Sequence, residues 1–238
     1  MVPQTASSYW ARSRKLANGW AIATAFVLIG IIASQSGAAW AGPSIQTLGG
    51  AIAMSIGVFW AVSTASHQLG DPLRDAVLWG TAFLLACAWF WLGGGDLGEW
   101  LGLSFERSNE HLPYQPGVSV YRHTRFFGVG PSRLVTAELL FGFLGGTMVH
   151  GASAFQARWT RWPWILLGGL AWSVATAVGG YVALAGFWLL GNVIGILLQP
   201  IAPAGAFIGV MMGGWLGGFV AAMIGLPLHQ YARRALLS

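Results

Sequence analysis

Six apolar blocks, separated by short polar or charged stretches, organise the chain. They cover residues 16–39, 48–65, 76–92, 134–154, a stretch that begins at 162, and 204–226. A helix needs about 20 mainly apolar residues to cross the hydrocarbon core of a bilayer, and most of these blocks are near that length. The pattern therefore predicts an all-α, polytopic integral membrane protein with six transmembrane helices.

The fifth block is ambiguous, because residues 163–198 contain no charged side chain. This stretch is too long for one straight span and short for two. One span followed by an interfacial or re-entrant stretch near residues 184–200 keeps the count at six, and such backbone is tolerated where protein buries it. A break at Gly179-Gly180, Gly191-Asn192 or Gln199-Pro200 would instead allow two spans and a total of seven.

The basic residues predict the orientation. With the N-terminus inside, one side of the membrane holds eight of them: Arg12, Arg14, Lys15, Arg74, Arg158, Arg161, Arg233 and Arg234. Lys and Arg collect in cytoplasmic loops, and short loops count most. We therefore expect cytoplasmic tails at 1–15 and 229–238, transmembrane helices 1–3 within 16–92, an exoplasmic loop at 93–133, and helices 4–6 within 134–228, in an inner or energy-transducing cell membrane.

A second interpretation of the N-terminus remains open. Basic residues, an apolar run and then Ala39-Trp40-Ala41 resemble a secretory signal with a cleavage site between small residues. Cleavage near residue 41 would leave a mature protein with five spans.

Composition agrees with a membrane protein and excludes several other classes. Only 8% of the residues are charged and 55% are hydrophobic, whereas a soluble domain carries about 25% charged residues. The net charge of +5 does not indicate nucleic-acid binding, because the basic residues form short clusters beside apolar blocks. The single cysteine, Cys87, rules out an intrachain disulfide.

Small residues recur at intervals of four in several blocks. The ladders centre on Gly49, Gly57, Gly142, Gly146, Gly205, Gly209, Gly213 and Gly217. Residues four apart share one helix face, and a face without side chains lets a second backbone approach closely in lipid. We therefore predict helix packing through these glycines; the alternative is a smooth pore or substrate path lined by them.

Three histidines fall near one membrane face on spans that run in the same direction: His67, His150 and His229. Imidazole can ligate haem iron, chlorophyll magnesium or a transition metal. The residues are therefore candidate ligands of a tetrapyrrole, although histidines at an interface also simply bond water or backbone.

Two acidic residues are singled out by their positions. Glu138 lies one turn inside the fourth block, where an ionisable group often marks a functional site. It is a candidate ligand or ion contact, or it lies within reach of interfacial water or of Arg133. Asp71 precedes Pro72 and predicts a helix start, with Asp71 as the N-cap.

The sequence contains no phosphate-binding loop, zinc-protease motif, nucleophile elbow or cysteine pair, so we do not expect an enzyme. The first hypothesis is a non-catalytic subunit that packs with other membrane subunits in the bilayer, holding a tetrapyrrole or a lipid. In its six short spans and small-residue ladders the chain also resembles the substrate-binding subunits of vitamin uptake transporters. That resemblance is architectural, and it implies a solute-binding transport component.

Overall fold

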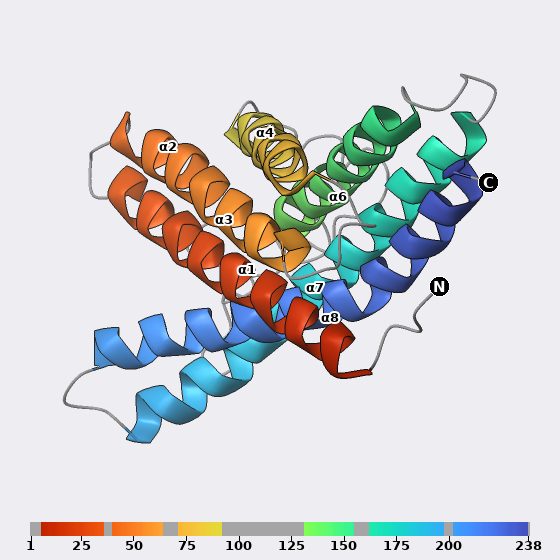
Figure 1. The fold of residues 1–238 in the computed structure, drawn as a ribbon. Coiled ribbons are helices and arrows are strands. Elements are labelled where there is room, and N and C mark those ends of the chain that lie inside the picture. The colour runs from red at the N-terminus through yellow and green to blue at the C-terminus, as the bar shows by residue number, and fades with distance from the viewer. Residues whose placement is uncertain are drawn as a thin grey trace, which may run out of the picture.

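The computed structural model describes residues 6–35, 40–63, 71–91, 131–154, 162–197 and 202–237 (Figure 1). The elements are α1 (Ala6–Gln35), α2 (Ala41–Ser44), the π-helix η1 (Ile45–Gly49), α3 (Gly50–Ser63), α4 (Pro72–Trp91), α6 (Pro131–Ala154), α7 (Trp162–Leu197) and α8 (Ala202–Leu237). These ranges contain helices and no strand, which confirms the all-α class.

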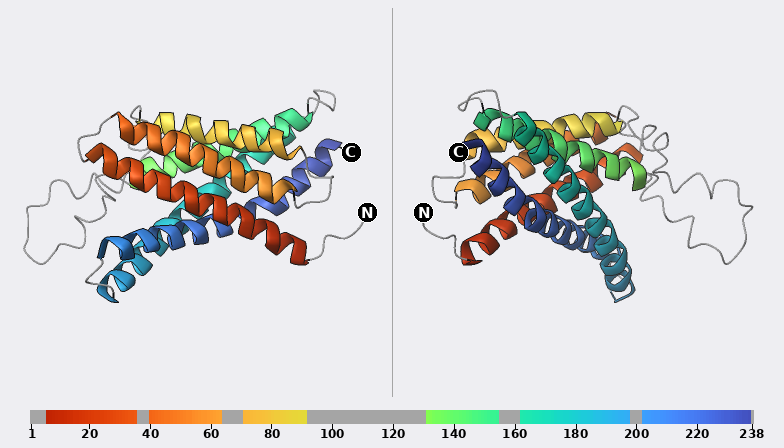
Figure 2. Two further views of the ribbon diagram at one scale, coloured as in Figure 1. Left: turned by 60° about the vertical axis from the view of Figure 1, so that its left-hand side comes forward. Right: turned by 90° about the vertical axis from the view of Figure 1, so that its right-hand side faces the viewer.

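The long helices form a closed ring. Helix α1 packs on α3, α3 on α4, α4 on α6, α6 on α7, α7 on α8, and α8 returns to α1. The start of α1 and the end of α8 lie at the same end of the bundle (Figure 2). We call this the terminal end, and we call the opposite end, where α1 finishes and α6 begins, the distal end.

The described helices confirm a membrane-embedded protein. Four segments are long and apolar enough to cross a bilayer: Ala41–Ser63, Pro72–Trp91, Trp162–Gly186 and Phe207–Ala232. Large apolar side chains point outward from the ring, among them Ile52 and Phe59 of α3 and Leu170 and Val174 of α7. Helices α1 and α6 complete the same ring, and the full count of six spans stays a prediction.

Two predicted tails are helical. Residues 6–15 belong to α1. This part of α1 packs on α8: Tyr9 Oη donates a hydrogen bond of 2.7 Å to the Met223 carbonyl group, and Arg12 is only 2% exposed. Helix α8 likewise continues through Pro227 to Leu237, so His229 lies within a helix. Packing between α1 and α8 extends both helices beyond their apolar blocks.

Helix α7 covers most of the fifth block. It runs from Trp162 to Leu197 without a break at Gly179-Gly180 or Gly191-Asn192. The candidate membrane span of this helix covers Trp162–Gly186. One span followed by an interfacial stretch stays a prediction, and the possible break at Gln199-Pro200 lies outside the described residues. Glycine weakens a helix in water, but in an apolar environment the backbone bonds of the helix are retained.

The predicted cap of α4 is confirmed. The Asp71 Oδ1 atom accepts hydrogen bonds from the backbone N–H groups of Leu73 at 3.0 Å and Arg74 at 3.3 Å. These bonds satisfy two donors that the first turn of a helix leaves without an internal partner.

Several glycines lie where two helices approach each other closely. A Cβ atom at Gly57 would lie 2.6 Å from the Gly19 Cα, and one at Gly146 would lie 2.7 Å from the Gly168 carbonyl oxygen. Four other predicted glycines also face a neighbouring helix: Gly49 faces the Phe26 ring, Gly142 the Trp172 carbonyl group, Gly217 the Gly179 carbonyl group and Gly213 the Gly186 backbone. Gly209 is buried, and the surroundings of Gly205 lie outside the described part of the chain. That assembly depends on the ladders stays a prediction.

Candidate functional site

A cavity of about 60 Å³ lies inside the ring near the terminal end, and we call it the terminal cavity. All six long helices contribute to its wall. Its polar lining consists of Arg12, Asp75, His229 and Gln230, and its aromatic lining of Trp20, Trp79, Phe141 and Trp172. Residues far apart in the sequence therefore converge on one space between the helices.

Buried charges of both signs face this cavity. Arg12 and Asp75 are each only 2% exposed. The Asp75 Oδ1 atom accepts hydrogen bonds from Arg74 Nε at 3.1 Å and from Arg74 Nη2 at 3.0 Å. Because an isolated charge in an apolar interior is strongly unfavourable, this group of charges must be held in a defined arrangement.

An aromatic cluster closes the cavity toward the middle of the bundle. The Phe141 ring centroid lies 5.2 Å from that of Trp79, 5.5 Å from Phe83 and 5.8 Å from Trp20, and Trp79 lies 5.0 Å from Trp172. All four contacts are edge-to-face, which places the positive edge of one ring on the negative face of the next. The cluster joins α1, α4, α6 and α7.

A second cavity, the distal cavity, lies on the other side of Phe141 and also has a volume of about 60 Å³. Its lining includes Gln46, Glu138, Cys87 and the rings of Phe83, Phe90 and Phe141. Since Phe141 lines both cavities, its ring separates them.

Glu138 is therefore placed inside the bundle, on the distal cavity. Its Oε2 atom is buried and has no hydrogen-bond partner among the described residues. The same holds for Oε1 of Gln46, whose side chain is only 3% exposed. The ligand or ion contact at Glu138 stays a prediction.

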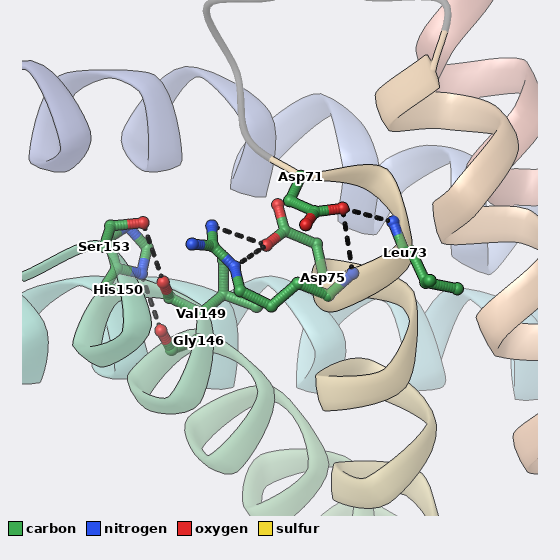
Figure 3. A network of polar contacts seen from close by, with 8 residues as sticks. Asp71, Leu73, Asp75, Gly146, Val149, His150 and Ser153 are labelled. Carbon is green, nitrogen blue, oxygen red and sulfur yellow. Dashed lines mark hydrogen bonds and ion pairs between the residues drawn. The ribbon is translucent and has the colours of Figure 1, made fainter. Parts of the chain in front are cut away.

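The structure brings together two of the three predicted histidines. The rings of His150 and His229 meet edge-to-face with centroids 4.6 Å apart, and His229 Nδ1 accepts a hydrogen bond of 3.4 Å from Trp172 Nε1. His150 is 1% exposed, and its Nδ1 atom lies 2.6 Å from the Gly146 carbonyl oxygen (Figure 3). His67 lies outside the described residues.

This histidine pair does not fit a tetrapyrrole. The His150 ring is enclosed by the His229 ring and by α7, where a Cβ at Gly168 would lie 2.5 Å from His150 Nδ1. The adjoining cavity measures about 60 Å³, whereas drug-sized ligands occupy pockets on the order of 300–1,000 Å³. No set of three metal-binding side chains occurs within the described ranges either.

Sequence reasoning missed most of the residues that line the cavities. Arg12 was interpreted only as a topology signal, and Gln46 fell in the connection before the second apolar block. The closeness of Gln46 to the second apolar block was the one feature of the sequence that could have indicated a buried polar side chain. Trp79, Phe141 and Trp172 carry no signal of their own, because a tryptophan or phenylalanine in an apolar block is equally typical of a lipid-facing position.

Comparison of the chain with protein-family models, with curated proteins and with solved structures gives no match.

Proposed function

We propose that the protein is a six-span membrane protein that binds a small solute in the terminal cavity, as the solute-binding component of a small-molecule transport system. The observation that carries this proposal is the cavity itself, to which every long helix contributes a side chain. Ligand sites in membrane bundles lie between helices, with a few polar groups that orient the ligand on an apolar wall.

The lining of the cavity suggests the chemistry of the solute. A polar group of the solute would meet Arg12 and Asp75, while an apolar part would rest on Trp79 and Trp172. Flat apolar groups pack favourably on such rings. The volume of about 60 Å³ favours a small amphipathic molecule.

A matched pair of substitutions tests this proposal. Val58 lines the cavity and is 3% exposed, whereas Val174 lies on the outer face of α7 and is 56% exposed. We expect native mass spectrometry of the full chain in nanodiscs to detect a small non-lipid molecule on the wild type and on Val174→Phe. Val58→Phe should lose that molecule, because the added ring fills the cavity. A wild type without a bound molecule, or equal occupancy in Val58→Phe, would contradict the proposal.

We propose that the terminal end faces the cytoplasm, as the bias of Lys and Arg favours. Cysteine labelling tests this orientation with little background, because the native Cys87 is buried. An impermeant maleimide should label Ser108→Cys on intact cells, and it should label Ser238→Cys only after permeabilisation. Both positions lie outside the described residues. The reverse pattern would show that the orientation is wrong.

A second candidate function is a structural subunit of a larger membrane complex, with lipid or partner chains on its outer faces. The length of helix α7 favours this second function. Its 36 residues extend over about 54 Å at the α-helical rise per residue, which is longer than the roughly 30 Å thickness of the hydrocarbon core. A partner that covers exposed side chains such as Tyr181 and Leu189 would explain this length. Purification in mild detergent, followed by identification of chains that remain bound in fixed proportion, tests the idea.

A further inference from the structure

The distal cavity contains two polar atoms for which the described residues supply no hydrogen-bond partner. These are the carboxylate oxygen Oε2 of Glu138 and the amide oxygen Oε1 of Gln46, for which the described residues supply no hydrogen-bond donor. Leaving a buried acceptor unpaired is unfavourable, and the penalty is larger when the acceptor is charged. Unpaired buried polar groups therefore require an explanation, and a bound ligand is one.

Neighbouring helices hold Glu138 firmly in this position. On α7, Thr176 Oγ1 donates a hydrogen bond of 2.6 Å to the Glu138 carbonyl oxygen, and Ser173 Oγ donates one of 2.8 Å to the carbonyl of Leu139. A Cβ at Gly180 would lie 2.9 Å from Glu138 Cγ, so the side chain packs directly on the α7 backbone. Two interhelical hydrogen bonds and a glycine contact thus fix the segment that carries the carboxylate.

Gln46 is held in a comparable way from the other side of the ring. It lies in the π-helix η1, a local widening that occurs frequently at functional sites. A Cβ at Gly30 would lie 2.7 Å from Gln46 Cβ, so α1 leaves room for this residue by carrying no side chain there. The Gln46 Nε2 atom contacts Cys87 Sγ at 3.9 Å, which leaves Oε1 as the acceptor without a partner.

Three phenyl rings complete the wall of the distal cavity: Phe83, Phe90 and Phe141. The faces of aromatic rings attract cations, and several rings around one carboxylate form the kind of cage that recognises organic ammonium groups. Among the described residues, the lining contains no basic side chain that would compete for the carboxylate.

We propose that the distal cavity binds a small protonated amine, with the Glu138 carboxylate as counter-ion and the Gln46 amide oxygen as a second acceptor for its N–H groups. A metal cation fits less well, because Ca²⁺ requires about six to eight oxygen ligands, and the side chains of this cavity offer the oxygens of one carboxylate and one amide. The proposal does not depend on the terminal cavity, which Phe141 separates from this site.

Isothermal titration calorimetry of the full chain in detergent micelles tests the proposal with ethylammonium chloride as the probe. We expect saturable binding of ethylammonium, and none of ethanol or of sodium chloride at the same ionic strength. Tetramethylammonium should bind at least about tenfold more weakly, because it has no N–H group to donate to the two acceptors.

Two variants assign the binding to the distal cavity. Glu138→Gln keeps the size of the side chain and removes its charge, and it should abolish the heat of ethylammonium binding. Gln46→Leu should weaken binding at least about tenfold through loss of one acceptor. The matched control Gln230→Leu removes an amide from the terminal cavity and should leave ethylammonium binding unchanged.

The affinities of the wild type and the three variants for ethylammonium are compared. Each variant is first checked for a thermal midpoint and an elution volume equal to those of the wild type. No saturable binding to the wild type, or the same affinity in Glu138→Gln and the wild type, would overturn the proposal. Equal heats from sodium chloride would overturn it as well, since any monovalent salt would then suffice. Loss of binding in Gln230→Leu would place the amine in the terminal cavity instead and refute the assignment.

Discussion

Replacing Gly217 by leucine is expected to separate α7 from α8 and to prevent recovery of folded protein. A Cβ at Gly217 would overlap the Gly179 carbonyl oxygen and would lie 2.7 Å from Ala183 Cβ, while a Cβ at Gly179 would lie 2.6 Å from the Gly217 carbonyl oxygen. The contact is therefore backbone against backbone, and neither helix can give way by a rotamer change. Overpacking of this kind costs about 1–3 kcal/mol and occasionally more, and a whole leucine should exceed that range.

The measurement is the yield of monodisperse protein after detergent extraction, together with its thermal midpoint. Gly217→Ala and Gly151→Ala form a matched pair, because a Cβ at Gly151 meets no atom within 4 Å. Alanine at Gly217 should lower the free energy of unfolding by about 1–3 kcal/mol. Alanine at Gly151 should be neutral or slightly stabilising, since alanine favours the helix more than glycine by about 1 kcal/mol. Equal behaviour of the pair would show that the ladder on α8 does not hold the bundle together.

Replacing Asp75 by alanine is expected to have the second large effect. Asp75 is 2% exposed, is paired with Arg74 at 3.0 Å, and is the one acidic side chain in the lining of the terminal cavity. Its removal leaves the Arg74 guanidinium without the carboxylate that it contacts at 3.0 Å. Removing one partner from a buried set of charges typically destabilises a protein by about 3–5 kcal/mol.

Asp71→Ala is the control for this prediction, because it makes the same change at the exposed cap of the same helix. Loss of the hydrogen bonds that Asp71 accepts from Leu73 and Arg74 should cost about 1 kcal/mol. The double variant Arg74→Leu with Asp75→Leu should recover part of the lost stability, since it removes both charges of the ion pair. Equilibrium unfolding in mixed micelles measures all of these variants. A loss in Asp75→Ala no greater than that in Asp71→Ala would contradict the prediction.

Phe141 contributes to the walls of both proposed sites. Phe141 contacts Trp20, Trp79 and Phe83 and lines both cavities. A solute at the terminal end and an amine at the distal end would therefore lie on opposite faces of one aromatic partition.

The histidines show where sequence periodicity succeeds and where it fails. Helix direction is readable from the alternation of apolar blocks, so the sequence correctly predicted that His150 and His229 approach the same end of the bundle. Whether two imidazoles leave space for a ligand depends on the residues opposite them. Those residues are Gly168 and Trp172 of α7, and no feature of the sequence pairs α7 with the histidines.

The sequence by itself determined the helical class, the membrane environment and the cap at Asp71, because each follows from residues close together in the chain. Hydrocarbon requires long apolar helices with internally satisfied backbones, and an N-cap involves only one helical turn. The tertiary structure alone decided that six helices close into a ring, that α7 continues unbroken to Leu197, and that Gln46 and Glu138 line one cavity. These features depend on which helix faces meet, and in lipid the apolar faces that pack on protein resemble in composition the faces that meet acyl chains.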